Sequence, residues 1–133
     1  MKSTEHDNKK SLNVLVVDDG EIELKLMSYF VSQISDWDIN CFQANCANDA
    51  IGILQSTSID VCLFDYYLAG ETGVELVNTL IEMGINKPVV MVTGLDEAEV
   101  DTLIHSCGIE HTLSKENLSP SSIAQSIHRA IEH

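Results

Sequence analysis

Three aspartates in the sequence each follow a short run of apolar residues. Asp18 and Asp19 come directly after Asn13 to Val17, and Asp65 comes directly after Val61 to Phe64. Such runs are typical of strands covered on both faces, where an unpaired carboxylate is costly to bury. Carboxylate oxygens at a site open to water are ligands that Mg²⁺ prefers, and a cation would offset their mutual repulsion. The three aspartates are therefore candidate metal ligands.

Two further residues stand at the ends of apolar runs. Thr93 follows Val89 to Val92, and Lys115 follows Ile109 to Ser114. A lysine supplies a positive point charge, and an Asp carboxylate between a metal and a lysine can attack a phosphoryl group to form an acyl phosphate. The hydroxyl of Thr93 can donate a hydrogen bond to a phosphoryl oxygen. Each residue alone has an ordinary interpretation as a cap, a turn residue or a solvated side chain, but the combination favours function.

The elements that must position these residues alternate along the chain. A second strand, near an edge of the sheet, is predicted for Asp38 to Ala44. Apolar spacing and end signals predict a helix after each of the five strands. The first two are Glu21 to Ser35 and a helix that is capped by Asn48 and ends near Ser56 to Ser58. The other three are Val74 to Met83, which follows a loop at Gly70 to Gly73, then Asp96 to Cys107, and a last helix from Ser119 and Pro120 to Ile131. Strict alternation favours an α/β fold with a doubly wound parallel sheet, whose carboxyl-end edge binds ligands.

Composition limits the classes of protein that this chain fits. Its 133 residues fit one domain, and 44% apolar with 21% charged residues is typical of a soluble globular protein. A net charge of −14 argues against nucleic-acid binding. The sequence lacks both an apolar run of membrane-spanning length and a secretory signal, so we expect a cytoplasmic protein without a membrane partner. The four cysteines lack metal-site spacing, which favours reduced, mostly buried thiols.

Four motifs in this order resemble the receiver domain of two-component response regulators, as in the single-domain chemotaxis receiver. They are NVLVVDD, VCLFDYYLAGETG, PVVMVTG and HTLSK, and together they span nearly all of the chain after a polar start. The resemblance implies a flavodoxin-like (βα)5 fold with strand order 2-1-3-4-5. We therefore expect a flexible leader at residues 1–11 and a receiver domain at residues 12–133.

The resemblance also implies a role for each candidate residue. Asp65 matches the phosphoacceptor, Asp18 and Asp19 match the acidic pair that holds Mg²⁺, and Tyr67 would add its backbone carbonyl to the metal. Thr93 matches the switch hydroxyl and Lys115 the lysine that pairs with the phosphoryl group. The implied partners are a sensor histidine kinase or phosphotransfer protein as donor and a downstream protein target. Such a domain catalyses its own phosphorylation and dephosphorylation and is not a turnover enzyme on an external substrate.

This sequence departs from the family pattern at several positions. Thr112, beside His111, stands where an aromatic switch residue is usual. Ala69 stands where the family often has a proline, and Glu116 follows Lys115 where the family commonly has a proline. We expect the partner surface to comprise His111, Thr112 and the helix Asp96 to Cys107. Tyr67 and Leu95 match positions that flank the path of the hydrolytic water. We therefore predict a phosphoryl lifetime longer than that of a fast chemotaxis-type receiver.

Three other classes of protein compete with this interpretation. Aspartyl-phosphate phosphatases also use a strand-end Asp and Mg²⁺, but they carry a second acid where this chain has Tyr67. A nucleotide-binding domain would need a glycine-rich phosphate loop, and neither GxGxxG nor GxxxxGK[ST] occurs. A degenerate receiver that only docks partners is favoured where a site residue is missing, and here all are present.

Overall fold

The structure, a computed structural model, describes residues 9–94 and 98–132. Five parallel strands form one sheet in the order β2-β1-β3-β6-β7. The fold is therefore the predicted doubly wound α/β sheet with strand order 2-1-3-4-5 counted along these five strands, and β2 forms the expected edge. The strands are β1 (Ser11–Val17), β2 (Asp38–Ala44), β3 (Val61–Asp65), β6 (Val89–Thr93) and β7 (His111–Ser114).

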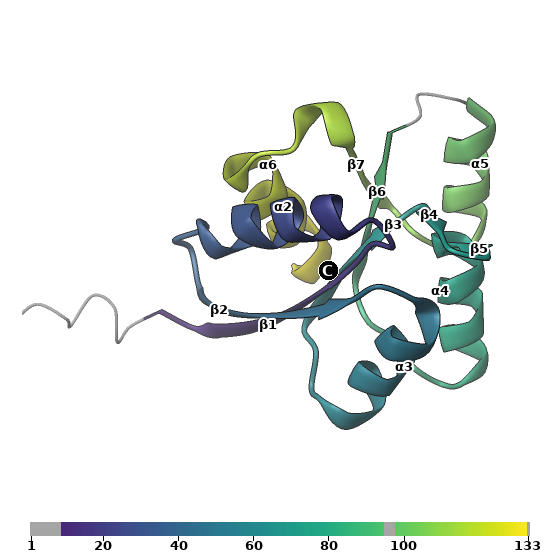
Figure 1. The fold of residues 1–133 in the computed structure, drawn as a ribbon, viewed down its shortest axis with the longest axis horizontal. Helices are drawn as coiled ribbons and strands as arrows, with labels where there is room; N and C mark the ends of the chain where they lie inside the picture. Colours follow the sequence, from purple (N-terminus) through teal and green to yellow (C-terminus); the bar gives the residue numbers. More distant parts are fainter. Residues whose placement is uncertain (1–8, 95–97, 133) are drawn as a thin grey trace, which may run out of the picture.

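Helices cover both faces of this sheet, as the ribbon in Figure 1 shows. Helices α2 (Glu21–Ser32) and α6 (Pro120–Ile131) pack on one face. The other face is covered by α3 (Ala47–Ser56), α4 (Gly73–Glu82) and α5 (Ala98–Ser106). A short antiparallel pair, β4 (Tyr67–Leu68) and β5 (Glu71–Thr72), precedes α4, and a 3-10 turn, η1 (Lys115–Asn117), follows β7.

Alternate residues of the central strands belong to two separate hydrophobic cores. Leu63 of β3 packs with α2 and α6, whereas its neighbours Cys62 and Phe64 pack with α3, α4 and α5. All five residues of β3 are buried. A strand buried on both faces must be apolar throughout, which explains why the runs lack alternation and why Asp65 is so conspicuous at the end of one.

Several predicted boundaries differ from the structure. The first helix ends at Ser32 and not at Ser35, because the chain turns at Gln33 so that Ile34 can still pack in the core. The second helix begins two residues earlier than predicted, with Cys46 and not Asn48 at its N-cap, where no side-chain hydrogen bond forms. The final strand begins at His111 and not at Ile109, after a left-handed turn at Gly108 (φ 90°).

Two other predictions concern the start of the chain and its cysteines. β1 already pairs with β2 from Ser11 onwards, two residues before the predicted strand, while residues 1–8 of the predicted leader lie outside the described residues. All four cysteines are free thiols. Only Cys62 is buried, so the prediction of mostly buried cysteines is wrong for Cys41, Cys46 and Cys107, which are half-buried.

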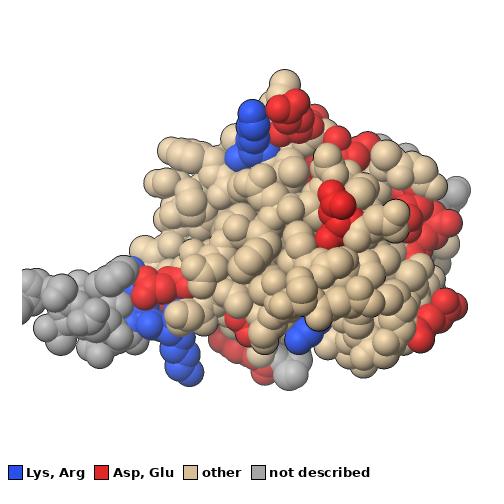
Figure 2. All heavy atoms as spheres, turned by 60° about the horizontal axis from the view of Figure 1, so that its bottom comes forward, with Lys and Arg blue, Asp and Glu red and all other residues tan. Residues whose placement is uncertain are grey.

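The face drawn in Figure 2 shows more acidic than basic side chains; the acidic ones are spread over the face, and some of the basic ones lie directly beside acidic ones. The whole sequence contains 21 acidic residues and 7 lysines and arginines, which gives the net charge of −14.

None of the helices among the described residues is sufficiently long and apolar to cross a membrane.

Candidate phosphoryl and metal site

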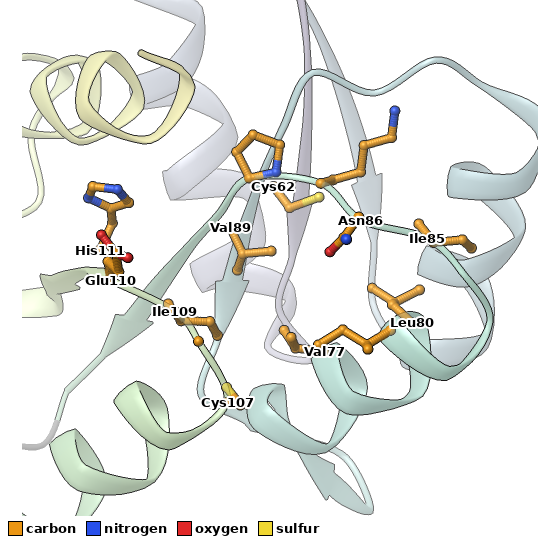
Figure 3. Close-up of a pocket in the computed structure, with 14 residues that line it drawn as sticks. Cys62, Val77, Leu80, Ile85, Asn86, Val89, Cys107, Ile109, Glu110 and His111 are labelled. Carbon is orange, nitrogen blue, oxygen red and sulfur yellow. The ribbon is translucent and has the colours of Figure 1, made fainter. Parts of the chain in front are cut away.

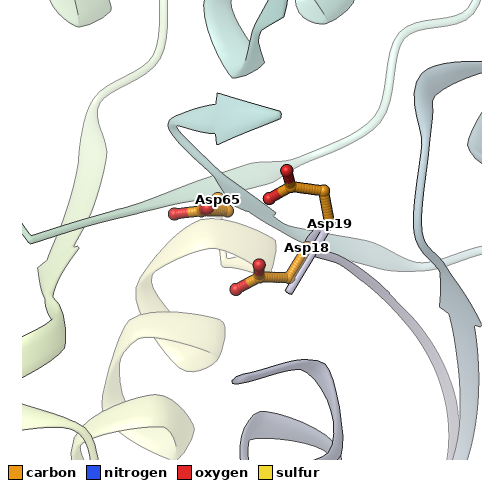
Figure 4. A group of neighbouring side chains, drawn as sticks. All are labelled: Asp18, Asp19 and Asp65. Carbon is orange, nitrogen blue, oxygen red and sulfur yellow. The ribbon is translucent and has the colours of Figure 1, made fainter. Parts of the chain in front are cut away.

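The carboxyl ends of two adjacent strands bring three aspartates together. Asp18 and Asp19 follow the last residue of β1, and Asp65 is the last residue of β3. These strands pair in parallel with Val17 opposite Phe64, so Asp18 and Asp65 occupy neighbouring places at the same edge. Figure 4 shows the three side chains converging there. One carboxylate oxygen from each lies within 4.8 Å of the others, the only such acidic group among the described residues.

Lys115 reaches this acidic cluster from the end of the edge strand β7. Its Nζ lies 3.1 Å from Asp65 Oδ1 and 3.8 Å from Asp18 Oδ2. Lys115 follows β7, and β6 separates β7 from β3, so the lysine spans a strand to make this contact. Asp18 is 1% exposed and Asp65 5%, whereas Asp19 is exposed. The cluster therefore has a buried inner side and one carboxylate facing solvent.

Burial and charge perturb the acid strengths of these groups. Burial, followed by the charge of Asp18, raises the pKa of Asp65 to about 6, although Lys115 opposes this shift. Burial is also the main cause that raises the pKa of Asp18. Burial lowers the pKa of Lys115, but the Asp65 and Asp18 carboxylates outweigh it and raise the pKa overall. One ammonium thus stabilises this group of carboxylates only in part.

The donor set fits a hard divalent cation. Asp18 Oδ1 accepts a hydrogen bond from the backbone N–H of Gly20 at 2.9 Å, which orients the carboxylate. Asp18 Oδ2 is buried and has no hydrogen-bond partner among the described residues. A buried anionic oxygen without a hydrogen bond is costly, and coordination would satisfy it. Three clustered carboxylates with solvent access on the Asp19 side are typical of sites that bind Mg²⁺ with several waters.

Thr93 and Lys115 lie at the same edge, as the sequence predicts. Thr93 is the last residue of β6, is buried, and pairs in register with Ser114, the residue before Lys115. The backbone N–H of Tyr66 donates to the carbonyl of Val92 at 2.8 Å, which fixes β6 beside the end of β3. The strand ends thus bring together four of the predicted side chains, Asp18, Asp19, Asp65 and Lys115, with Thr93 in the adjacent strand.

The segment after Asp65 is a small hairpin, where the sequence predicts a loop. Tyr67 pairs with Thr72 in this β4–β5 hairpin, and Thr72 then caps α4 through reciprocal hydrogen bonds with Glu75. The Tyr67 side chain is 54% exposed, and its ring packs edge-on against the buried ring of Tyr66, with centroids 4.7 Å apart. The hairpin therefore holds Tyr67 in a defined place two residues from Asp65.

Two glycines approach this site closely. A Cβ at Gly73, the first residue of α4, would lie 2.7 Å from the backbone oxygen of Asp65 and 2.7 Å from Met91 Sδ. A Cβ at Gly20 would overlap the carboxylate of Glu23, in the first turn of α2. Glu23 is not among the site residues predicted from the sequence, because an acidic first turn is ordinary in helices. Its short spacing from the aspartate pair is the signal that could have identified it.

Three further residues singled out from the sequence are Thr112, His111 and Leu95. Thr112 is exposed in the middle of β7, and His111 is half-buried at its start. Leu95 lies outside the described residues. Thr112 therefore faces outward from the edge strand, away from the cores, and is accessible to a partner protein.

A separate cavity of about 240 Å³ opens at the opposite end of the strands, between the C-terminal ends of α4 and α5 (Figure 3). Its lining includes Cys62, Leu80, Val89, Cys107 and His111. Burial raises the pKa of the Cys62 thiol to about 12, so this thiol is inert as a nucleophile at neutral pH. None of the acidic site residues lines this cavity, so it is separate from the acidic site.

The fold and the acidic edge define a doubly wound α/β domain with a metal-type site at its strand ends. The family model for the response regulator receiver domain matches residues 14–128, and the chain belongs to this family. This confirms the resemblance and identifies a signal-transduction domain of two-component systems.

Relatives and solved structures agree with this assignment. The chain is 30% identical over 109 residues to the sensor histidine kinase RcsC of Salmonella typhimurium, covering 82% of this chain and 11% of that protein. It is 27% identical over 97 residues to the autoinducer 1 sensor kinase/phosphatase LuxN of Vibrio harveyi, covering 72% of this chain and 11% of that one. The response regulator domain of Thermotoga maritima CheB superposes with a TM-score of 0.79 at 18% identity, covering 93% and 98% of the two chains. The chain thus spans about a tenth of either kinase, and the CheB likeness concerns the fold.

Proposed function

We propose that this domain is the phosphoacceptor of a two-component system or phosphorelay, with Asp65 as the residue that takes the phosphoryl group. The observation that carries the proposal is the position of Asp65, which lies beside the buried, incompletely partnered Asp18 and within 3.1 Å of the ammonium of Lys115. Few structural reasons would keep three carboxylates clustered at one strand edge. The same position serves a nucleophile well, because the ammonium of Lys115 and a cation held by the aspartates would both stabilise incoming negative charge.

In the proposed reaction an Asp65 carboxylate oxygen attacks the phosphorus of a phosphohistidine or a small acyl phosphate. A new oxygen–phosphorus bond forms as the bond to the donor imidazole nitrogen or acyl oxygen breaks, and the electron pair leaves with the donor. Asp18, Asp19 and Asp65 would hold Mg²⁺, together with the backbone carbonyl of Tyr67. When bound, the cation supplies neutralisation of the phosphoryl charge. Lys115 and the hydroxyl of Thr93 would hold phosphoryl oxygens, and the same groups would assist hydrolysis.

The donor class that we propose is a histidine kinase or a phosphotransfer protein. The similarity to two sensor kinases, RcsC and LuxN, supports this class. The surface beside Asp65 is also suited to a protein donor. Three apolar side chains of α2 are exposed along one stripe, Ile22 at 78%, Leu26 at 47% and Tyr29 at 59%. A partner that covers this stripe would approach the strand ends from the α2 side.

The output of the proposed switch is a change in the face formed by the fourth and fifth strand–helix units. Phosphorylation adds nearly two negative charges at Asp65, and the Thr93 hydroxyl at the end of the adjacent strand β6 is the group that we expect to respond. The exposed groups on that face, Thr112 of β7 and Leu103 of α5, would contact the downstream protein. Thr112 lacks an aromatic ring, so the switch would rely on Thr93 and the segment after β6.

The proposed function is tested by Asp65→Asn against a matched control. Intact-mass spectrometry after incubation with acetyl phosphate and Mg²⁺ should show one added phosphoryl group on the wild-type chain and none on Asp65→Asn. Asp49→Asn, in the exposed first turn of α3, removes the same charge away from the site and should label like wild type. Undiminished labelling of Asp65→Asn would refute the assignment and favour another acceptor. Absence of labelling in all three proteins would favour a docking-only receiver.

A further inference from the structure

Glu23 places a fourth carboxylate beside the acidic site. The first turn of α2 begins three residues after Asp18, and the Glu23 side chain folds back over Gly20. A Cβ on Gly20 would overlap Glu23 Oε1 and would lie 3.5 Å from Asp18 Oδ1. The Glu23 and Asp18 carboxylates therefore flank the same backbone position, and the absence of a side chain at Gly20 leaves room for both.

Two site residues respond electrostatically to Glu23. After the larger effect of burial, the Glu23 charge adds to the rise in the pKa of Asp18. Burial opposes the rise in the pKa of Lys115, and Asp65, Asp18 and then Glu23 contribute to it. Glu23 is thus close enough to act on the site, although it is exposed and is not one of the three carboxylates whose oxygens converge.

We propose that Glu23 is a positioning residue of the metal site, which raises the affinity for a divalent cation from outside the set of direct ligands. This inference rests on the proposed function, because the cation is the one that the phosphoryl site would hold. The Glu23 carboxylate, which lies next to Gly20 as that of Asp18 does, would act by its charge and by accepting hydrogen bonds from water bound to the metal. Asp18 Oδ2, buried and without a hydrogen-bond partner among the described residues, independently marks the place where a cation would bind.

The charge balance gives Glu23 a second consequence. Four carboxylates against the one ammonium of Lys115 leave three excess negative charges before a cation binds. A divalent cation reduces this excess to one. An anionic phosphoryl donor is repelled more strongly by the cation-free site than it would be without Glu23. Glu23 therefore makes phosphorylation depend more steeply on the divalent cation, a property of this chain's α2 and not of the three aspartates alone.

Glu21 provides a matched control on the same helix. It lies in the same first turn of α2, but its side chain is 83% exposed and forms an ion pair with Lys25 at 3.4 Å. Replacing either glutamate by glutamine removes one negative charge and keeps the side-chain size. A difference in Mg²⁺ affinity between Glu21→Gln and Glu23→Gln therefore reflects the position of the Glu23 carboxylate beside Gly20, because both variants change the net charge of the protein equally.

The experiment measures Mg²⁺ binding to the full, unphosphorylated chain by isothermal titration calorimetry. We expect Glu23→Gln to weaken binding by about three- to tenfold, the range for removing one solvent-screened charge near a divalent ion. Glu21→Gln should bind within about twofold of wild type, since its charge is screened and paired. If Glu23→Gln binds Mg²⁺ as tightly as Glu21→Gln does, the proposal is overturned. Thermal unfolding in EDTA checks that each variant folds.

Gly20→Ala tests the geometry without changing a charge. The backbone of Gly20 is extended (φ −84°, ψ 123°), so alanine is sterically allowed there, while its Cβ would displace the Glu23 carboxylate. We expect Gly20→Ala to weaken Mg²⁺ binding in the same direction, and to have no added effect when combined with Glu23→Gln. An equal loss in both backgrounds would show that Gly20 acts independently of Glu23, contrary to the proposal.

The outcomes separate this inference from the proposed function. If the wild-type chain binds no Mg²⁺ and accepts no phosphoryl group from acetyl phosphate, the proposed function fails and Glu23 has no site to act on. If the wild-type chain binds Mg²⁺ and is labelled, and Glu23→Gln matches it in both metal affinity and the Mg²⁺ concentration needed for labelling, only the inference about Glu23 fails.

Discussion

Lys115 contacts Asp65 across an intervening strand, with Nζ 3.1 Å from Asp65 Oδ1. The ammonium belongs to the residue that directly follows β7 and the carboxylate to the last residue of β3, and β6 lies between these strands. Their pairing therefore depends on the whole sheet and not on one local turn. It also keeps an ammonium beside Asp65 in the absence of a phosphoryl group.

Removing this ammonium should slow phosphorylation. Lys115→Met keeps the length of the apolar stem and removes the charge that we expect to stabilise the transferred phosphoryl oxygens. We predict that the rate of labelling by acetyl phosphate falls by about 10- to 100-fold, as measured by intact-mass spectrometry. Lys25→Met removes an exposed lysine that pairs with Glu21 on α2, and it should leave the rate unchanged. Equal rates in the two variants would contradict the role of Lys115.

The raised pKa of Asp65 predicts a pH-dependent effect on stability in the absence of metal. The folded state holds the Asp65 proton up to about pH 6, whereas the ordinary pKa of an Asp is 3.8. Between these values the folded state binds more protons than the unfolded state, so the Asp65 contribution to stability falls as pH rises from about 4 to 6. Above pH 6 the ionised carboxylate remains a cost to folding.

Asp65→Asn should remove this cost. In EDTA at pH 7.5 we expect the melting temperature of Asp65→Asn to exceed that of wild type by about 5 °C, and the difference to shrink toward pH 4. Differential scanning calorimetry across this range measures it. A stability difference that is constant with pH would contradict the proposed ionisation of Asp65.

Gly73 should tolerate no side chain. A Cβ there would be 2.7 Å from the backbone oxygen of Asp65, and neither that backbone nor the buried Met91 can move freely. We predict that Gly73→Ala lowers the free energy of unfolding by about 1–3 kcal/mol and also slows labelling of Asp65. Chemical denaturation measures the first effect.

Gly52 is the control for this substitution. It lies inside α3, where a Cβ would meet no atom within 4 Å apart from the adjacent backbone of its own helix, so Gly52→Ala should raise the unfolding free energy by about 0.5–1 kcal/mol. Destabilisation of similar size at both glycines would show that close packing against Asp65 is not the cause.

Tyr67 should control how long the phosphoryl group persists. Its ring packs against Tyr66 and its backbone belongs to the β4–β5 hairpin, two residues from Asp65. We expect a bulky side chain at this place to hinder an attacking water. We predict that Tyr67→Ala shortens the phosphoryl half-life several-fold after acetyl phosphate is removed. Tyr29→Ala, which removes a similarly exposed tyrosine on α2, should not change it. Loss of the phosphoryl group from the wild-type chain within seconds in Mg²⁺ would also contradict the predicted long lifetime.

The sheet and the main site could be predicted from the sequence because both depend on strong local signals. Unalternating runs such as Val61 to Phe64 can be stable only inside a sheet covered on both faces, and an Asp at the end of such a run is rare without a reason. The strand order came from the family resemblance. The meeting of Lys115 with Asp65 followed from the rule that parallel strand ends share one edge.

Features set by tertiary packing could not be predicted in the same way. The β4–β5 hairpin has only two residues in each strand, too few for a periodic pattern. The N-cap at Cys46 makes no side-chain hydrogen bond, so it carries no capping signal, whereas Asn48 does by residue type alone. The contact between Glu23 and Gly20 depends on a side-chain direction that spacing does not specify.

The central claim is tested most directly by locating the phosphoryl group. The wild-type chain is incubated with acetyl phosphate in Mg²⁺ or in EDTA, reduced with borohydride, which converts an aspartyl phosphate to homoserine, and sequenced by tandem mass spectrometry. Phosphorylation at Asp65 predicts homoserine at position 65 in Mg²⁺ and unmodified aspartate there in EDTA. Homoserine at Asp18 or Asp19 in place of position 65, or none at any position in Mg²⁺, would contradict it.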